Sequence, residues 1–268
     1  MNPIKFYRLP DWIKNLGIVL VALTINATQA QHLAVLPFAA FLFAYAFSIN
    51  DYYDAKLSGE TNYLHDKLGG ETLLLCVAPA IVATIMSFLF GITVVLTSLI
   101  FLFSMWAYSC PPVRAKRIPF IDLLLNVICF GVIPYTVVLT CLGISFDTRN
   151  TILLVLFSLY VAYSEVIHQL SDLPEDIKAG IGSIPQLIGK RASYLLSMLF
   201  VVMPLALSVP YLYIDLASYS FLIITVGFSA IRLMVLLRHA DYRWLRDNSF
   251  GSFEGLSYIA YFLLLRLI

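Results

Sequence analysis

Two short segments of the chain concentrate acidic residues at helical spacing. Asn50 and Asp54 are four residues apart in NDYYDAKLSGE, and so are Asp172 and Asp176 in DLPEDIKAG. Residues at that spacing share one face of a helix, where like charges such as those of Asp172 and Asp176 repel. The repulsion grows where little water screens it. A cation between the carboxylates would relieve it, and Mg2+ prefers such hard oxygen ligands, with water and phosphate oxygens completing its shell.

A basic segment supplies groups that bind phosphate. The sequence YSCPPVRAKR holds Arg114, Lys116 and Arg117 within four residues. Its two prolines end the preceding helix, and Arg8 and Lys14 add positive charge near the start of the chain. A basic loop alone can simply face the cytoplasm, and an acidic loop alone can simply cap a helix. A metal ion combined with guanidinium and ammonium groups, however, can clamp a diphosphate and stabilise its departure.

Membrane helices must position these segments. Hydrophobic residues are 60% of the 268 residues and charged residues are 12%, about half the roughly 25% of a soluble domain, which excludes a soluble enzyme. A membrane-crossing helix needs about 20 mostly apolar residues. This rule predicts an all-α bundle of nine transmembrane helices around a central cavity. The spans are expected at residues 12–30, 33–49, 71–90, 92–109, 119–143, 152–170, 192–211, 217–237 and 252–268.

The distribution of charge predicts the orientation of the chain. The net charge is +1, which lacks the basic excess of a nucleic-acid binder. Most of the 17 lysine and arginine residues lie at the N-terminus or after spans two, four, six and eight. The positive-inside rule places these segments in the cytoplasm. We therefore expect a multi-pass protein of a prokaryotic plasma membrane, with its N-terminus, cavity mouth and active site cytoplasmic.

The positions of the acidic segments suggest an internal duplication. They follow spans two and six, four helices apart. A single domain over residues 1–268 built from two four-helix units, about 12–110 and 119–237, would bring the two acidic segments face to face across a bundle.

Four segments, in order, resemble the motifs of the UbiA superfamily of intramembrane prenyltransferases. They are NDxxD at Asn50, Asp51 and Asp54, YS-x-PP-x-R-x-K at Tyr108 to Lys116, DxxxD at Asp172 and Asp176, and the tail GIGSIPQLIG from Gly180 to Gly189. The resemblance implies nine helices and transfer of a prenyl group from a polyprenyl diphosphate to a small aromatic or lipidic acceptor. It implies Mg2+ as the cofactor and diphosphate as the second product.

The residues and the resemblance together suggest roles for individual side chains. The expected metal ligands are Asn50, Asp51, Asp54, Glu60, Asp172 and Asp176. The expected diphosphate-binding residues are Arg8, Lys14, Arg114, Lys116 and Arg117. The expected catalytic residues are Asp54, Asp172, Asp176, Lys116 and Tyr108, the last of which would bind the diphosphate or face the developing carbocation.

Other functions stay open. The N-terminal sequence RLPDWIKN is similar to the decaprenyl-phosphate phosphoribosyltransferase branch, which would transfer a phosphosugar to a polyprenyl phosphate. A membrane terpene cyclase could use the same metal site without an acceptor. A non-enzymatic transporter would bind an anion between the acidic segments and release no diphosphate.

Further expectations concern the end of the sixth span and the acids within the membrane. Pro174 lies between the two aspartates, which predicts that the span ends near Ser171 and that a short helix begins with Asp172 as its N-cap. His168 and Gln169 would then be polar residues at the span's end, able to contact an acceptor.

The most membrane-embedded acids are Glu165 and Asp122, with Arg232 as a candidate partner. A charge at mid-bilayer costs about 2.5–3.5 kcal/mol, so each should face the cavity or a partner.

Glu60 is predicted to complete the first acidic segment. Ser58 occupies the position of a common third acid in the family, whereas Glu60 lies six residues past Asp54 and has the longer side chain. We expect Glu60→Gln to lower turnover or raise the Mg2+ requirement, and Ser58→Ala to have little effect. The Mg2+ dependence of both variants, measured side by side, tests this. A normal Glu60→Gln beside an impaired Ser58→Ala would assign the third ligand to Ser58.

Overall fold

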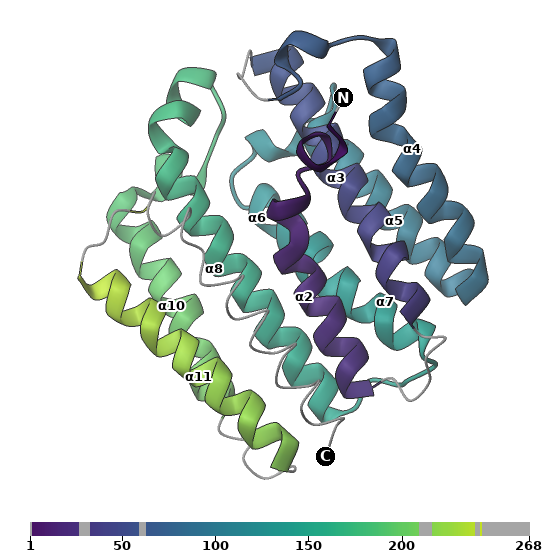
Figure 1. Cartoon of the computed structure of the whole chain (residues 1–268). Coiled ribbons are helices and arrows are strands. Elements are labelled where there is room, and N and C mark those ends of the chain that lie inside the picture. The colour runs from purple at the N-terminus through teal and green to yellow at the C-terminus, as the bar shows by residue number, and fades with distance from the viewer. Residues whose placement is uncertain (1, 27–32, 59–62, 209–215, 239–241, 243–268) are drawn as a thin grey trace. The chain divides into compact units, whose positions relative to one another are not determined.

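The computed structural model describes residues 2–26, 33–58, 63–208, 216–238 and 242. Within these ranges all regular elements are helices, and no strand occurs. The chain divides into two compact units. Figure 1 colours the ribbon by residue number, so the residue ranges of each unit can be followed by colour. Unit 1 comprises residues 1–116 and 133–145, and unit 2 comprises residues 117–132 and 146–268.

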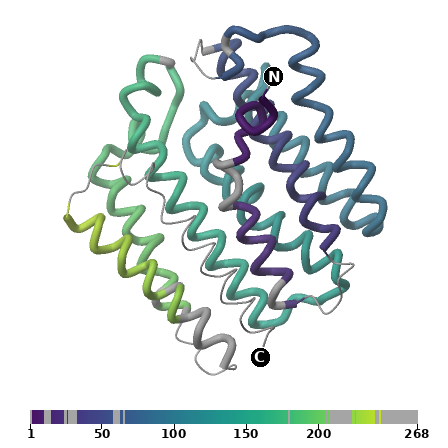
Figure 2. The backbone as a smooth tube through the Cα atoms, viewed as in Figure 1, coloured from purple at the N-terminus to yellow at the C-terminus, as the bar shows by residue number. Residues whose placement is uncertain are grey.

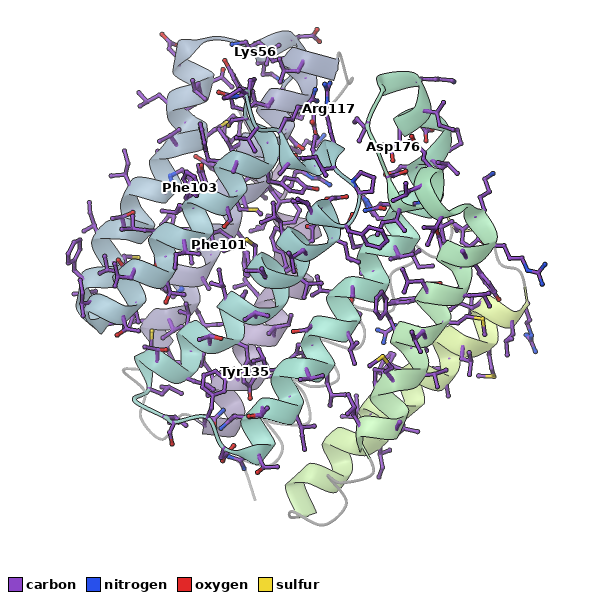
Figure 3. All side chains as sticks on the ribbon, turned by 180° about the vertical axis from the view of Figure 1, so that it is seen from behind. Lys56, Phe101, Phe103, Arg117, Tyr135 and Asp176 are labelled. Atoms are coloured by element: carbon purple, nitrogen blue, oxygen red, sulfur yellow. The ribbon has the colours of Figure 1, made fainter. Side chains whose placement is uncertain are left out.

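Unit 1 is built around α3. Its longer helices are α2 (Leu9–Asn26), α3 (Val35–Ser58), α4 (Gly70–Ser87), α5 (Ile92–Ser109) and α7 (Ile133–Cys141). Its short helical turns are α1 (Pro3–Phe6), η2 (His65–Lys67), η3 (Phe88–Phe90) and η4 (Ala115–Arg117). The last of these ends at the first residue of unit 2. α3 packs against α2, α4, α5 and α7. On α5, Phe101 is fully buried whereas Phe103 is 66% exposed (Figure 3). A helix that is apolar on both faces suits a membrane span.

Unit 2 is built around α8. Its elements are α6 (Ile121–Asn126), the π-helical segment η5 (Val127–Val132), α8 (Thr148–Ala179), α9 (Ile184–Ile188), α10 (Lys190–Ser208) and α11 (Leu216–Leu237). α8 contacts α6, η5, α9 and α10, and α10 also packs against α11. Gly131 allows η5 to approach α8 closely, because a Cβ there would lie 3.2 Å from the Cα of Ser158.

Five described helices are long and apolar enough to cross a membrane. They cover Val35–Leu57, Gly70–Phe90, Ile92–Ser109, Ile121–Cys141 and Thr148–Lys178, which correspond to predicted spans two to six. Helices α2, α10 and α11 occupy predicted spans one, seven and eight. The ninth predicted span, 252–268, lies outside the described residues, so the count of nine stays a prediction.

The helix break expected at Asp172 is wrong. α8 runs without interruption from Thr148 to Ala179, a continuous helix in the backbone trace (Figure 2). It carries Pro174 inside it. Proline removes the backbone hydrogen bond to the carbonyl four residues earlier, here that of Leu170, and its ring crowds that carbonyl. Burial of Leu170 and Leu173 holds the helix together across this point. α8 ends instead at Gly180, whose left-handed backbone (φ 63°, ψ 31°) closes the last turn.

The orientation can be tested at exposed positions beside the helix ends. Val113 and Lys178 are exposed and expected in the cytoplasm, whereas Thr151 is exposed and expected outside. Single cysteines at the first two should react with a membrane-impermeant reagent from the cytoplasmic side, and a cysteine at Thr151 from the opposite side. The unmodified chain is the control, because its four cysteines are buried or partly buried. Labelling of positions 151 and 178 from the same side would contradict a membrane-spanning α8.

Candidate functional site

Residues 50–58 of the first acidic segment form the last turns of α3 in unit 1. The Nδ2 of Asn50 donates a hydrogen bond of 2.9 Å to the Oδ2 of Asp54, which confirms that the two residues share a helix face. Asp54 is only 5% exposed. A carboxylate this buried needs charge compensation from neighbouring groups.

The basic segment provides that compensation. The Nζ of Lys116 forms an ion pair with the Oδ1 of Asp54, and the Nη2 of Arg114 lies 3.6 Å from the same oxygen. Lys116, itself 8% exposed, also donates to the Oδ1 of Asn50 at 3.4 Å. The hydroxyl of Ser109, the last residue of α5, donates to that amide oxygen at 3.2 Å. The structure therefore brings Asn50 and Asp54, which were predicted as metal ligands, into direct contact with Lys116 and Arg114, which were predicted to bind diphosphate.

A second arginine neutralises the neighbouring aspartate. The Nη1 of Arg8 lies 3.0 Å from the Oδ1 of Asp51, and its guanidinium lies 5.3 Å from the ring centroid of Phe47. Arg8 and Arg114 both have positive φ, 49° and 42°. Side-chain-bearing residues avoid this region, at a cost of about 1–3 kcal/mol. The backbone is thus strained at both arginines that contact the first acidic segment.

The donor set suits a hard divalent cation next to a phosphate. Two carboxylates and an amide oxygen occur within one turn of α3, and three cationic side chains reach them. Among the described residues, no group of three or more His, Cys, Asp or Glu is placed to hold a metal. A cation here would therefore take part of its shell from water or phosphate oxygens, as Mg2+ commonly does.

The other residues predicted for the first site are placed differently. Tyr108 is partly buried in the last turn of α5, and Arg117 is exposed and belongs to unit 2 (Figure 3). Lys14 lies in α2, but its side chain is outside the described part of the structure, and Glu60 lies wholly outside it.

Cys110, which follows α5, is a buried neutral thiol. Burial raises its pKa to about 11, although a hydrogen bond with Tyr53 lowers the pKa in part. At neutral pH the thiol therefore stays protonated and adds no charge next to Asn50.

The second acidic segment lies in the last turns of α8 in unit 2. Asp172 and Asp176 are both partly exposed and lie on one face of the helix, with Asp176 near its end (Figure 3). The Nδ1 of His168 lies 3.5 Å from the Oδ2 of Asp172. The predicted shared face of the two aspartates is therefore present, on a longer helix than expected.

Sequence reasoning missed the role of Gln169. Its Nε2 donates to the Oδ2 of Asp122 at 2.6 Å and to the Oε1 of Glu165 at 3.2 Å. The spacing of four residues between Glu165 and Gln169 was the available signal. Arg232, suggested as a partner for these acids, has its guanidinium 4.7 Å from the ring centroid of Tyr160.

Comparison with known proteins identifies the family. The model of the UbiA prenyltransferase family matches residues 15–251. The chain belongs to the UbiA prenyltransferase family. The resemblance found in the four motifs is thereby confirmed. No curated protein matches the chain.

Solved structures of UbiA homologues share the fold. A UbiA homolog from Archaeoglobus fulgidus bound to DMAPP and Mg2+ has a TM-score of 0.80 at 17% identity, covering 98% of both chains. The same homolog bound to GPP and Mg2+ has a TM-score of 0.80 at 18% identity, covering 99% of both chains. A UbiA homolog from Aeropyrum pernix K1 has a TM-score of 0.65 at 18% identity, covering 96% of this chain and 98% of that one. The fold is therefore that of the UbiA family.

The ion pairs of Asp54 generate a prediction about stability. Lys116→Met should lower the free energy of unfolding by up to about 3 kcal/mol, because it removes one partner of a buried carboxylate. Thermal unfolding in detergent measures the loss. Adding Asp54→Asn should recover part of it, because the uncompensated charge is then gone.

Lys56→Met is the matched control. Lys56 is exposed, with its Nζ 5.7 Å from the ring centroid of Tyr52, so its removal should change stability little. A Lys116→Met variant as stable as the wild type would show that this ion pair contributes nothing to the fold.

Proposed function

We propose that this protein transfers a prenyl group from a polyprenyl diphosphate to a small aromatic or lipidic acceptor, with Mg2+ as cofactor and diphosphate as second product. The observation that carries the proposal is the grouping of Asn50 and Asp54 with Lys116 and Arg114. It combines metal-binding oxygens with phosphate-binding cations in one place. The A. fulgidus homolog bound to DMAPP or GPP with Mg2+ supports this choice of substrate.

The proposed metal ligands are Asn50, Asp51, Asp54 and Glu60 in the first acidic segment, and Asp172 and Asp176 in the second. All are hard oxygen donors, which fits Mg2+. When bound, the metal would neutralise charge on the departing diphosphate. This leaves the cationic side chains to recognise the phosphate oxygens directly.

The chain's own cations would bind and hold the leaving group. Lys116 and Arg114 already face oxygen atoms at the site, so each can exchange a carboxylate oxygen of Asp54 for a phosphate oxygen. We assign supporting contacts to Arg8, Lys14 and Arg117, and contact with the diphosphate or the developing cation to Tyr108. The allylic C–O bond breaks with its electron pair leaving on the diphosphate. The acceptor then bonds to the allylic carbon and loses the proton of the C–H or O–H group that attacked, which passes to water or to the released diphosphate.

We place the reaction at the cytoplasmic face of a prokaryotic plasma membrane. The excess of basic residues near the acidic segments supports this side of the membrane.

Transfer of a phosphosugar to a polyprenyl phosphate is the second candidate. The similarity of RLPDWIKN to the phosphoribosyltransferase branch favours it. Both reactions use a diphosphate donor, so the same cations and metal ligands would serve. The two reactions therefore differ in the group that the diphosphate donor carries, a prenyl group or a phosphosugar.

Incubation of purified protein with Mg2+, a panel of prenyl diphosphates and a lipid extract tests the proposal. We expect diphosphate release and a product heavier than the acceptor by one prenyl group. Activity only with phosphoribosyl diphosphate would favour phosphosugar transfer. Diphosphate release with a hydrocarbon product would indicate a cyclase, and the absence of release with every donor would favour an anion transporter.

Variants of the carboxylates test the proposed metal ligands. Asp54→Asn and Asp172→Asn should each lower turnover by about a hundredfold or more, because each removes charge that the metal needs at the leaving group. EDTA should abolish activity in the wild type. Diphosphate release is the measurement in each case.

Asp66→Asn is the matched control. Asp66 is exposed in η2, between the two acidic segments in the sequence, so turnover should stay at the wild-type value. Full activity of Asp54→Asn and Asp172→Asn, or of the wild type in EDTA, would refute the metal site.

A further inference from the structure

The side chain of Gln169 joins three segments of unit 2. Its Nε2 donates to Asp122 at the start of α6 (2.6 Å) and to Glu165 one turn earlier in α8 (3.2 Å). Its Oε1 accepts the backbone N–H of Ile184, the first residue of α9, at 2.9 Å. A glutamine amide has two N–H donors and one carbonyl oxygen. Both ends of the group are therefore used, at a site only 5% exposed.

This set of hydrogen bonds around Gln169, the Gln169 junction, lies one turn before the second acidic segment along α8. Gln169 precedes Asp172 by three residues and Asp176 by seven, so all three share one face of α8. At 1.5 Å per residue the aspartates lie about 4.5 and 10.5 Å further along the axis. Whatever fixes Gln169 therefore fixes the turn from which both aspartates project.

The end of α8 needs such support. Pro174 cannot donate to the carbonyl of Leu170, so the helix lacks one backbone hydrogen bond between the two aspartates. Leu173 before the proline is buried, whereas Glu175, Ile177 and Lys178 after it are exposed and add no buried packing. The last turn therefore depends on what holds it from either side.

The segment that follows α8 is fixed at two points. A Cβ on Gly182 would lie 2.4 Å from the carbonyl oxygen of Arg117, so the backbone is pressed against that residue. Two residues later, Ile184 is fully buried in the same core as Val166, Ile167 and Leu170 of α8. The hydrogen bond from Ile184 to Gln169 then ties this segment back to α8.

We propose that Gln169 is a positioning residue for Asp172 and Asp176. By holding the starts of α6 and α9 to one turn of α8, it sets the direction in which the last turns of α8 present the two carboxylates. The inference rests on the proposed function, in which these aspartates bind Mg2+.

The amide is the group this position requires. A carboxylate at 169 would add a third acid next to Asp122 and Glu165 and supply no donor to either. A leucine would remove one donor from each acid and the acceptor of the Ile184 N–H, which is costly for buried groups. Gln169→Glu and Gln169→Leu therefore disrupt the junction by different routes.

Amide hydrogen exchange tests the junction without reference to activity. In Gln169→Leu, peptides covering residues 173–179 and 181–188 should exchange about tenfold faster than in the wild type, because the Ile184 N–H has lost its acceptor. Gln186→Leu is the matched control: Gln186 is exposed and its amide bonds the carbonyl of Ile181 in its own segment. Unchanged exchange in Gln169→Leu would overturn the proposal.

The Mg2+ dependence of diphosphate release tests the positioning role. Groups that orient metal ligands change metal affinity or activity by about 10–100-fold when removed. We expect Gln169→Leu and Gln169→Glu to raise the half-saturating Mg2+ concentration about tenfold or more, and Gln186→Leu to leave it unchanged. Faster exchange with an unchanged Mg2+ requirement would overturn the positioning role and leave a purely structural junction.

A double variant in which the acid and the amide swap positions provides the rescue. Combining Asp122→Asn with Gln169→Glu restores one donor and one acceptor between the two positions, and should recover part of the Mg2+ affinity lost in Gln169→Glu. A pair no better than Gln169→Glu would contradict action through Asp122. A wild type without Mg2+-dependent diphosphate release would refute the proposed function, and the exchange experiment would still decide whether the junction exists.

Discussion

A buried carboxylate at the end of an apolar helix is the constraint on which unit 1 depends. Asp54 is almost fully removed from solvent, and an ionised group there is tolerated only with close compensation. Lys116, Arg114 and Asn50 supply it. These contacts fix the loop after α5 to the end of α3. The need to neutralise one acid thus also assembles the groups that a diphosphate requires.

Unit 2 satisfies its buried Asp122 and its half-buried Glu165 in another way. The amide groups of Gln169 and Asn126 donate to Asp122, and Gln169 also donates to Glu165. Amides satisfy hydrogen bonds without adding charge, so they hold a geometry without providing cations for a phosphate. The contacts of the buried acids therefore differ between the units: Asp54 is bound by cations, whereas Asp122 is bound by amides.

Local spacing in the sequence predicted much of the candidate site. The shared face of Asn50 and Asp54 followed from their spacing, and Lys116 and Arg114 were singled out by residue type and by the resemblance to a family. Their direct ion pairs with Asp54 were not predicted, because they join residues about 60 positions apart. The helix break at Asp172 was predicted wrongly, because Pro174 was weighed without the burial of Leu170 and Leu173, which depends on tertiary packing. The junction at Gln169 joins residues 47 and 15 positions apart, and spacing along one helix cannot show such contacts. The contribution of Glu60 and the ninth span remain predictions.

The left-handed backbone at Arg8 and Arg114 has an evolutionary consequence. Glycine or asparagine would adopt these φ values more readily than arginine, so substitution to either would relieve local strain while deleting a guanidinium from the neighbourhood of Asp51 or Asp54. Selection for a more stable chain and selection for anion recognition therefore act in opposite directions at both positions. A stabilised descendant of this protein would be most easily reached at the expense of the cations that give the first acidic segment its chemistry.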